Sequence, residues 1–259
     1  MTVARADSLP GAAATTTWGG TFHVRMAWVC AAVGVIGFTP SYWLPLFTGT
    51  IAVPAIVHMH ATVFYAWLAL VVVQSHLIAS RRLTRHRELG VLGVAIATAM
   101  VFVGVAAAIV SMKQGVAAGF GNQARAFSVV PVTGILFFAG LVAVSLLNVR
   151  RPEVHRRLIL IATVSILNAA VGRLFRLAIG APPPSATAVP PPIAFTILPG
   201  LLTDLLLVPA LVRDRLRLGH VHRVYWVGGA ALLASQLLRP VIGNSEAWQA
   251  FAGWLMRLI

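Results

Sequence analysis

Long apolar runs, separated by short polar or turn-rich stretches, make up most of the chain. A helix needs about 20 mostly apolar residues, at a rise of about 1.5 Å each, to cross the hydrocarbon core of a bilayer. The segments that meet this requirement are 22–44, 54–79, 88–111, 127–149, 158–179, 193–213 and 222–242. The pattern therefore predicts an all-α, polytopic membrane protein with seven transmembrane helices.

The same pattern divides the chain into three regions. Residues 1–21 contain no apolar core and are predicted to form a flexible cytoplasmic tail, followed by the membrane domain over 22–243. In residues 244–259 the apolar side chains recur every three to four positions, which is typical of an amphipathic helix lying on a membrane surface. These side chains are Trp248, Phe251, Trp254, Leu255 and Ile259. The alternative is that this segment extends the seventh span and packs on its neighbours.

Arginines beside the predicted spans indicate the orientation of the chain. The connections after spans two, four and six each carry four arginines, whereas the alternate connections carry Lys113 and Arg125 alone. Loops that stay in the cytoplasm carry the excess of Lys and Arg. We therefore predict that the N-terminus is cytoplasmic and the C-terminus lies outside. The arginines are Arg81, Arg82, Arg85, Arg87, Arg150, Arg151, Arg156, Arg157, Arg213, Arg215, Arg217 and Arg223.

Composition excludes several other classes of protein. Hydrophobic residues make up 59% of the 259 positions and charged residues 10%, against about 25% charged in soluble domains. A soluble enzyme, a disordered chain and a fibrous chain are excluded. The formal net charge is +14, but the cations lie between apolar runs and form no separate basic domain, so no nucleic-acid partner is expected. Cys30 is the single cysteine, which excludes an intrachain disulfide.

A His-Arg pair recurs where predicted spans three, five and seven begin. The histidines are His86, His155 and His222, separated by 69 and 67 residues. One interpretation is interfacial chemistry at the start of a helix, since arginines at membrane interfaces extend toward the headgroups. The other is that the three histidines converge on one cytoplasmic site for a transition metal or for haem b.

Several of these motifs together resemble a known group of proteins. His60, Trp67 and Gln74, then His86-Arg87-Glu88-Leu89-Gly90 and His155-Arg156-Arg157-Leu158, are similar to those of an uncharacterised family of bacterial seven-helix inner-membrane proteins. Gly219 to His222, Gln236, Arg239 and the Trp248–Trp254 tail resemble its last third. The resemblance covers most of residues 55–255 and implies a multi-pass fold in a bacterial inner membrane, without an activity. The histidines near helix ends are also similar to those of multihelix b-type haem membrane proteins.

Polar residues inside the predicted spans are the candidates for a binding site, because burying them in a bilayer is costly. Asp204 is expected near the middle of span six, and it needs a partner or a proton. Its favoured partner is Arg173, and Arg239 is the second choice. With these residues we expect a polar, electropositive cavity open to the outside, whose ligand-binding side chains are His60, Trp67, Arg173, Arg176, Asp204, Gln236 and Arg239. The alternatives are arginines that extend to headgroups and an ion pair that only holds spans five to seven together.

Spacing excludes several kinds of chemistry. The chain has no HxxH, HxxxH or HExxH pattern, no GxSxG and no P-loop, and Lys113, its one lysine, lies outside the predicted spans. Three hypotheses remain. The first is a protein that binds or transports a small anionic or amphipathic molecule, the second a haem- or metal-dependent redox protein, and the third a structural subunit of a larger membrane complex or homo-oligomer.

Overall fold

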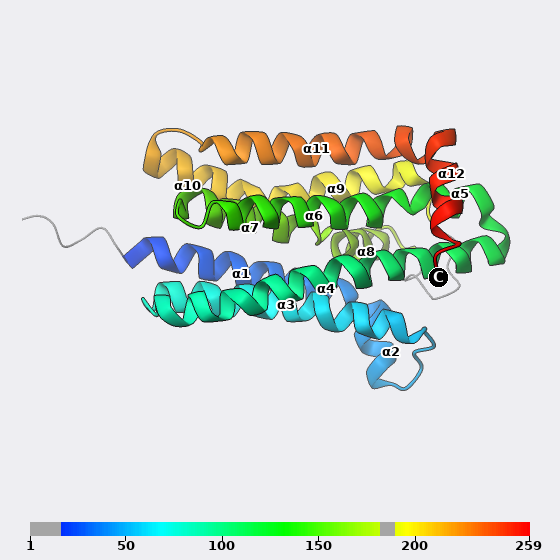
Figure 1. The fold of residues 1–259 in the computed structure, drawn as a ribbon, viewed down its shortest axis with the longest axis horizontal. Helices are drawn as coiled ribbons and strands as arrows, with labels where there is room; N and C mark the ends of the chain where they lie inside the picture. Colours follow the sequence, from blue (N-terminus) through cyan, green and yellow to red (C-terminus); the bar gives the residue numbers. More distant parts are fainter. Residues whose placement is uncertain (1–16, 182–189) are drawn as a thin grey trace, which may run out of the picture.

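The computed structural model describes residues 17–181 and 190–259, and every regular element in these ranges is helical. Long helices run side by side along one axis, and a short C-terminal helix crosses one end of the bundle (Figure 1). The longer helices are α1 (Thr17–Phe38), α3 (Ala55–Ala79), α4 (Leu83–Gly115), α6 (Val129–Leu147), α7 (Pro152–Ser165), α8 (Asn168–Ala178), α9 (Ile197–Asp204), α10 (Val208–Leu218), α11 (Arg223–Gly243) and α12 (Glu246–Leu255). Short elements link them: η1 (Thr39–Trp43), α2 (Leu44–Phe47), η2 (Val116–Phe120), α5 (Gly121–Phe127), η3 (Ile193–Thr196) and η4 (Leu205–Leu207).

Four helical stretches in the described residues are long and apolar enough to cross a membrane. They are Thr21–Phe47, Ala55–Ala79, Leu83–Leu147 and Ile193–Leu218, and the bent pair α7–α8 makes a fifth if it counts as one span. The prediction of an all-α protein with several transmembrane helices is confirmed in this form. Helices also cover nearly all of the seven predicted segments, but the count of seven spans stays a prediction.

The longest of these stretches, Leu83–Leu147, is not one straight rod. After α4 the chain turns through η2 and α5, where Gly119 has φ +92°, a conformation that favours glycine. The turn brings α6 back alongside α4 (Figure 1). This stretch therefore passes along the bundle twice.

Two other helices are interrupted near the middle of the bundle. α7 and α8 meet at an angle of 41°. Between α9 and α10 the short η4 precedes Pro209, which has no N–H to donate to the preceding turn. Both breaks lie near the polar residues of predicted spans five and six.

The main core lies between the long helices and is almost entirely apolar. Trp67 belongs to it: its side chain is 3% exposed, its ring meets Phe138 edge to face, and its Nε1 donates to Thr163 Oγ1 at 3.3 Å. Large apolar side chains such as Phe102, Leu147 and Trp226 instead cover the outside of the bundle. An apolar exterior of this kind suits contact with lipid.

The three arginine-rich connections lie at the same end of the bundle. Residues 80–82, 148–151 and 219–222 turn there, beside the start of α1 (Figure 1). The described connections at residues 48–54, 116–128 and 244–245 lie at the opposite end (Figure 1). This arrangement agrees with the charge asymmetry of the sequence, while the direction in which the bundle faces stays a prediction.

The C-terminal helix α12 packs on its neighbours with one face and exposes the other. Ala252 and Leu255 are buried against Met112 and Val132, and Trp248 Nε1 donates to the Arg125 carbonyl at 3.0 Å. Phe251 and Trp254, which lie beside the buried positions on the helix surface, are exposed. The helix α12 therefore packs on its neighbours and also presents apolar side chains on its exposed surface. The position of α12 on a membrane surface stays a prediction.

Most of the predicted N-terminal tail, 1–21, lies outside the described residues, and α1 begins at Thr17.

Candidate functional site

A cavity of about 520 Å³ lies in the half of the bundle opposite the arginine-rich connections. Its walls come from the end of α1, the first half of α3, the second half of α4, the start of α6, the α7–α8 break, η3 and α9. Most of the lining is apolar, with side chains such as Phe64, Leu68 and Ile135. Its volume is within the range of small-molecule binding sites, about 300–1,000 Å³.

The charged side chains that line this cavity are all cationic. They are Arg173 and Arg176 on α8 and Arg239 on α11. Among the lining residues in the described part of the chain there is no Asp or Glu. A mostly apolar cavity with three guanidinium groups provides an electropositive environment for a ligand with an acidic group and an apolar body.

Arg173 is held by contacts on the α1 side of the cavity. Its Nε donates to Ser41 Oγ at 2.9 Å, its Nη1 donates to the Ala169 carbonyl at 3.0 Å, and its guanidinium lies 4.2 Å from the centre of the Phe38 ring. Arg173 forms no ion pair with Asp204, so the favoured partner predicted from the sequence is wrong. The reason is rotational: the α7–α8 break turns Arg173 toward η1 and away from α9.

Arg239 is the most deeply buried of the three arginines. Its side chain is 3% exposed, and its Nε and Nη1 have no hydrogen-bond partner. The guanidinium reaches toward α6, where a Cβ added to Gly134 would lie 3.7 Å from Nη2. Burying donors of a charged group without partners costs free energy, about 1–3 kcal/mol or more for each group. Unpaired donors of a buried guanidinium in the lining of a cavity favour an anionic ligand there.

Asp204 lies at the end of α9 beside α11 and is not part of the cavity lining. Its Oδ1 accepts from Gln236 Nε2 at 3.1 Å. No ion pair joins Asp204 to Arg239 in the described part of the chain. The second partner predicted from the sequence therefore makes no direct contact of this kind with Asp204.

His60 lines the cavity from α3, with its ring 4.0 Å from that of Phe64 and its Nδ1 without a hydrogen-bond partner. The structure thus brings together His60, Arg173, Arg176 and Arg239 around one space. Gln236 and Asp204 form a pair behind Arg239, and Trp67 belongs to the core. Whether any of them binds a ligand stays a prediction.

Sequence reasoning did not single out a set of aromatic side chains that form one wall of the cavity. Tyr65 accepts from Trp43 Nε1 at 2.9 Å and donates to the Gly34 carbonyl at 3.1 Å. The Tyr42 hydroxyl lies 3.0 Å from His58 Nδ1. The signal in the sequence is the Ser41-Tyr42-Trp43 run at the end of span one, since Tyr and Trp favour the boundary between apolar and polar surroundings.

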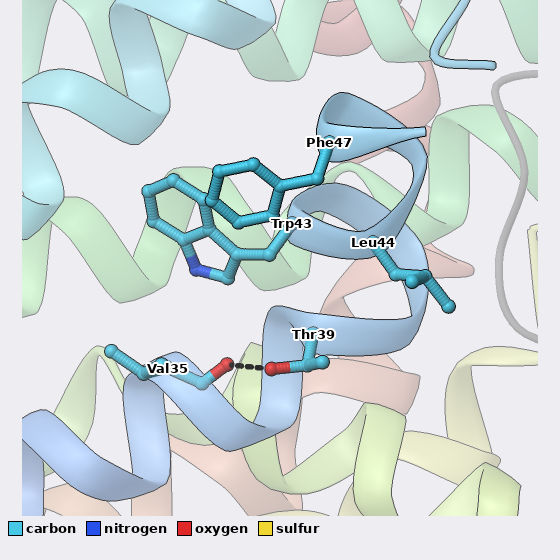
Figure 2. A pocket seen from close by; sticks show the side chains of 5 residues that line it. All are labelled: Val35, Thr39, Trp43, Leu44 and Phe47. Atoms are coloured by element: carbon cyan, nitrogen blue, oxygen red, sulfur yellow. Dashed lines mark hydrogen bonds between the residues drawn. The ribbon is translucent and has the colours of Figure 1, made fainter. Parts of the chain in front are cut away.

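On the outer side of the same wall is a shallow apolar groove. Figure 2 shows Trp43 stacked on Phe47 beside Leu44, with the Thr39 hydroxyl donating to the Val35 carbonyl at 2.8 Å. This groove contains no charged or titratable side chain. It has no means of orienting a polar ligand, so the candidate site is the arginine-lined cavity.

The three histidines of the His-Arg repeat have different surroundings. His155 Nδ1 lies 2.8 Å from Ser145 Oγ, and His222 Nδ1 accepts from the Val224 N–H at 3.2 Å, where it caps α11. His86 Nδ1 is buried and has no hydrogen-bond partner in the described part of the chain. Among the described residues no group of three or more His, Cys, Asp or Glu side chains is arranged to hold a metal ion. The predicted convergence of all three histidines on one metal is not found in this part of the chain.

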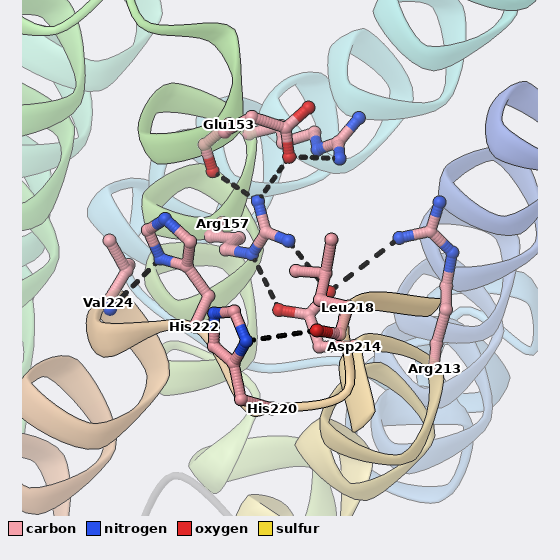
Figure 3. Close-up of polar contacts among 9 residues, drawn as sticks. Glu153, Arg157, Arg213, Asp214, Leu218, His220, His222 and Val224 are labelled. Carbon is pink, nitrogen blue, oxygen red and sulfur yellow. Dashed lines mark hydrogen bonds and ion pairs between the residues drawn. The ribbon is translucent and has the colours of Figure 1, made fainter. Parts of the chain in front are cut away.

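A second polar cluster, which the sequence analysis did not predict, lies near His222 (Figure 3). Arg157 Nε and Nη2 donate to the two carboxylate oxygens of Asp214 at 2.9 and 2.7 Å, and both side chains are 2% exposed. Arg157 Nη1 donates to Glu153 at 2.6 Å, and Arg213 lies 3.9 Å from Asp214. Because its charged groups bond to one another, this cluster serves to hold α7 to α10.

No protein-family model, curated protein or solved structure matches this chain. The functional conclusion therefore rests on the geometry of its own residues.

Proposed function

We propose that this chain is a seven-span protein of a bacterial inner membrane, with a cytoplasmic N-terminus, that binds or transports a small anionic or amphipathic molecule in its arginine-lined cavity. The observation that carries the proposal is Arg239, which is 3% exposed, lines the cavity, and has Nε and Nη1 without hydrogen-bond partners. A ligand carboxylate, sulfonate or phosphate would satisfy these donors.

The apolar part of the lining supports a ligand with a hydrophobic body. Phe64, Leu68 and Ile135 line the same cavity as Arg173 and Arg239. An amphipathic molecule would place its acidic group among the arginines and its apolar part against these side chains. The hydrophobic contact would add affinity in proportion to the apolar area removed from water.

Ligand binding can be tested with a matched pair of amphipathic probes. Decanesulfonate keeps its negative charge at all pH values of interest, and decyltrimethylammonium has the same chain with a positive charge. Each is titrated calorimetrically into the full-length protein in lipid nanodiscs, with empty nanodiscs as the reference for partition into lipid. We expect saturable binding of the sulfonate only.

The Arg239→Gln variant should bind decanesulfonate at least about tenfold more weakly, because a hydrogen bond to a charged group contributes about 1.5–3 kcal/mol. Arg257→Gln, which removes an exposed arginine after α12, is the matched control and should bind as the unmodified protein does. Arg239→Lys keeps the positive charge, so it separates a loss of probe affinity caused by the missing charge from one caused by misfolding. Circular dichroism checks the fold of each variant. Equal binding of both probes, or unchanged affinity in a folded Arg239→Gln variant, would refute the proposal.

A further inference from the structure

We propose that the cavity binds its anionic ligand together with one proton, which Asp204 takes up when the acidic group of the ligand occupies Arg239. This inference rests on the proposed function and adds a regulation of the same site. It concerns three residues: Asp204 on α9, and Gln236 and Arg239 on α11.

Gln236 links Asp204 to the arginine that lines the cavity. It donates to Asp204 Oδ1 at 3.1 Å and precedes Arg239 on α11 by one helical turn. Arg239 lines the cavity and Asp204 does not. In the ligand-free cavity, Asp204 is the acid that balances the buried charge of Arg239. An anion bound to Arg239 would place a second negative charge near Asp204. A like charge disfavours the ionised form of a carboxyl group, so ligand binding favours the protonated form of Asp204.

Gln236 is arranged to accommodate both forms of the carboxyl group. Its Nε2 donates to Asp204 Oδ1 at 3.1 Å, which suits the carboxylate. Its Oε1 is buried and has no hydrogen-bond partner. A protonated Asp204 carries an O–H that can donate to this oxygen. The side chain of Gln236 is 2% exposed and packs against Gly200, where an added Cβ would lie 3.0 Å from its Oε1. The amide is therefore held beside Asp204 by packing.

The exchange keeps the charge of the site constant. Without ligand, the negative charge of Asp204 balances Arg239. With ligand, the bound anion balances Arg239, and Asp204 holds a proton taken from solution. Burying an additional charge without compensation would be costly, and this exchange avoids that cost.

Other charged groups on the elements around α9 do not offer the same exchange. Arg173 and Arg176 on α8 and Arg239 on α11 are guanidinium groups, which have donors only and no acceptor for a further proton. η3 and η4 contain no titratable side chain. The charged residues of α7 belong to the cluster around Arg157, which lies at the other end of the bundle. Arg223 and Tyr225, at the start of α11, also lie at that end. Within the cavity itself, His60 is the one imidazole in the described lining, so the test must separate it from Asp204.

The test measures decanesulfonate binding to the full-length protein in nanodiscs between about pH 5 and about pH 9. Because the probe does not titrate, any pH dependence belongs to the protein. We expect affinity to fall as pH rises, by up to about tenfold per pH unit. Calorimetry in two buffers of different ionisation enthalpy should show uptake of up to one proton for each probe bound.

Three variants identify the group that takes up the proton. Asp204→Asn should bind the probe without pH dependence and without proton uptake. Glu246→Gln, which removes an exposed acid at the same end of the bundle, should behave as the unmodified protein does. His60→Gln should retain the proton uptake. Circular dichroism and thermal unfolding check that each variant is folded.

The outcomes separate this inference from the function on which it rests. Three results with a bound probe would refute proton coupling through Asp204 and leave the binding function in place. The first is that the unmodified protein shows no pH dependence of affinity. The others are that the pH dependence survives in Asp204→Asn, or that it disappears only in His60→Gln. If Asp204→Asn does not fold, Gln236→Leu, which removes both amide contacts, should change the pH at which affinity falls, and no change would refute the inference. If the probe does not bind at any pH, both proposals fail.

Discussion

At the scale of single residues, two aspartates of the helical stretch Ile193–Leu218 have different surroundings. Asp204 is partly buried and accepts one hydrogen bond from a neutral amide, that of Gln236. Asp214 is 2% exposed and receives two hydrogen bonds from the guanidinium of Arg157. A fully paired buried carboxylate is suited to a structural role, whereas one without a direct cation can respond to a change in charge nearby.

The Arg157–Asp214 pair should be sensitive to loss of one partner and tolerant of loss of both. Asp214→Asn leaves a buried guanidinium without its counter-charge, so we expect a loss of about 3–5 kcal/mol in the free energy of unfolding. The double variant Arg157→Met with Asp214→Leu should recover most of this loss, because well-packed apolar residues often replace a buried ion pair at little cost. Thermal unfolding in detergent measures both.

Glu153→Gln is the control for this pair. Glu153 contacts Arg157 as well, but its side chain is 53% exposed. Exposed ion pairs contribute little to stability, so its replacement should change the melting temperature only slightly. A destabilisation as large as that of Asp214→Asn would contradict the interpretation that the buried contact with Asp214 dominates.

At the scale of elements, close helix contacts and helix breaks place the cavity walls. α1 approaches α8 at Gly37, where an added Cβ would lie 2.6 Å from the Ala170 carbonyl oxygen and 2.7 Å from its Cβ. This contact brings Gly34, Phe38 and Ser41 close to the α8 arginines. The α7–α8 break then turns Arg173 toward η1. Neither feature follows from the apolar pattern of the individual helices.

Gly37→Ala tests the role of this contact. The added methyl group meets backbone atoms that cannot move alone, so we expect a lower melting temperature and weaker decanesulfonate binding. Gly140→Ala in α6 is the matched control, because nothing lies within 4 Å of its added Cβ. Both substitutions gain about 1 kcal/mol of helix propensity, so the difference between them reports the steric contact. Equal melting temperatures for the two variants would contradict the close approach.

At the scale of the whole molecule, charge and polarity divide the bundle into two ends. The arginine-rich connections and the Arg157–Asp214 cluster lie at one end, and the cavity lies in the other half (Figure 1). If the arginine-rich end faces the cytoplasm, as the positive-inside rule predicts, the cavity lies toward the outside. Its proposed ligand and proton would then enter from that side.

Reporter fusions test this orientation. A reporter that is active only in the cytoplasm should give a signal when fused after Gly219, between α10 and α11, and none when fused after Gly49, between α2 and α3. A reporter that is active only outside should show the reverse. The same signal at both positions would contradict the predicted path of the chain, and a reversed pattern would place the cavity on the cytoplasmic side.

Properties that depend on short stretches of sequence were predictable for this protein. The all-α class, the positions of the helices and the gathering of arginines into alternate connections follow from hydropathy and charge along the chain, because a bilayer requires long apolar helices with their polar groups at the ends. The same reasoning found His60, Arg173, Arg176 and Arg239, since a polar side chain inside an apolar run stands out without knowledge of its neighbours.

The partners of these residues depended on the tertiary structure. Arg173 bonds to Ser41 and not to Asp204, and Trp67 packs on Phe138 in the core. The Arg157–Asp214 pair was missed because Asp214 lies just beyond predicted span six. Hydropathy shows where a helix lies along the chain, but not how far it is rotated about its own axis or where it breaks. Close contacts between helices, such as Gly37 with Ala170, and the bend between α7 and α8 set those rotations and so decide which polar groups meet.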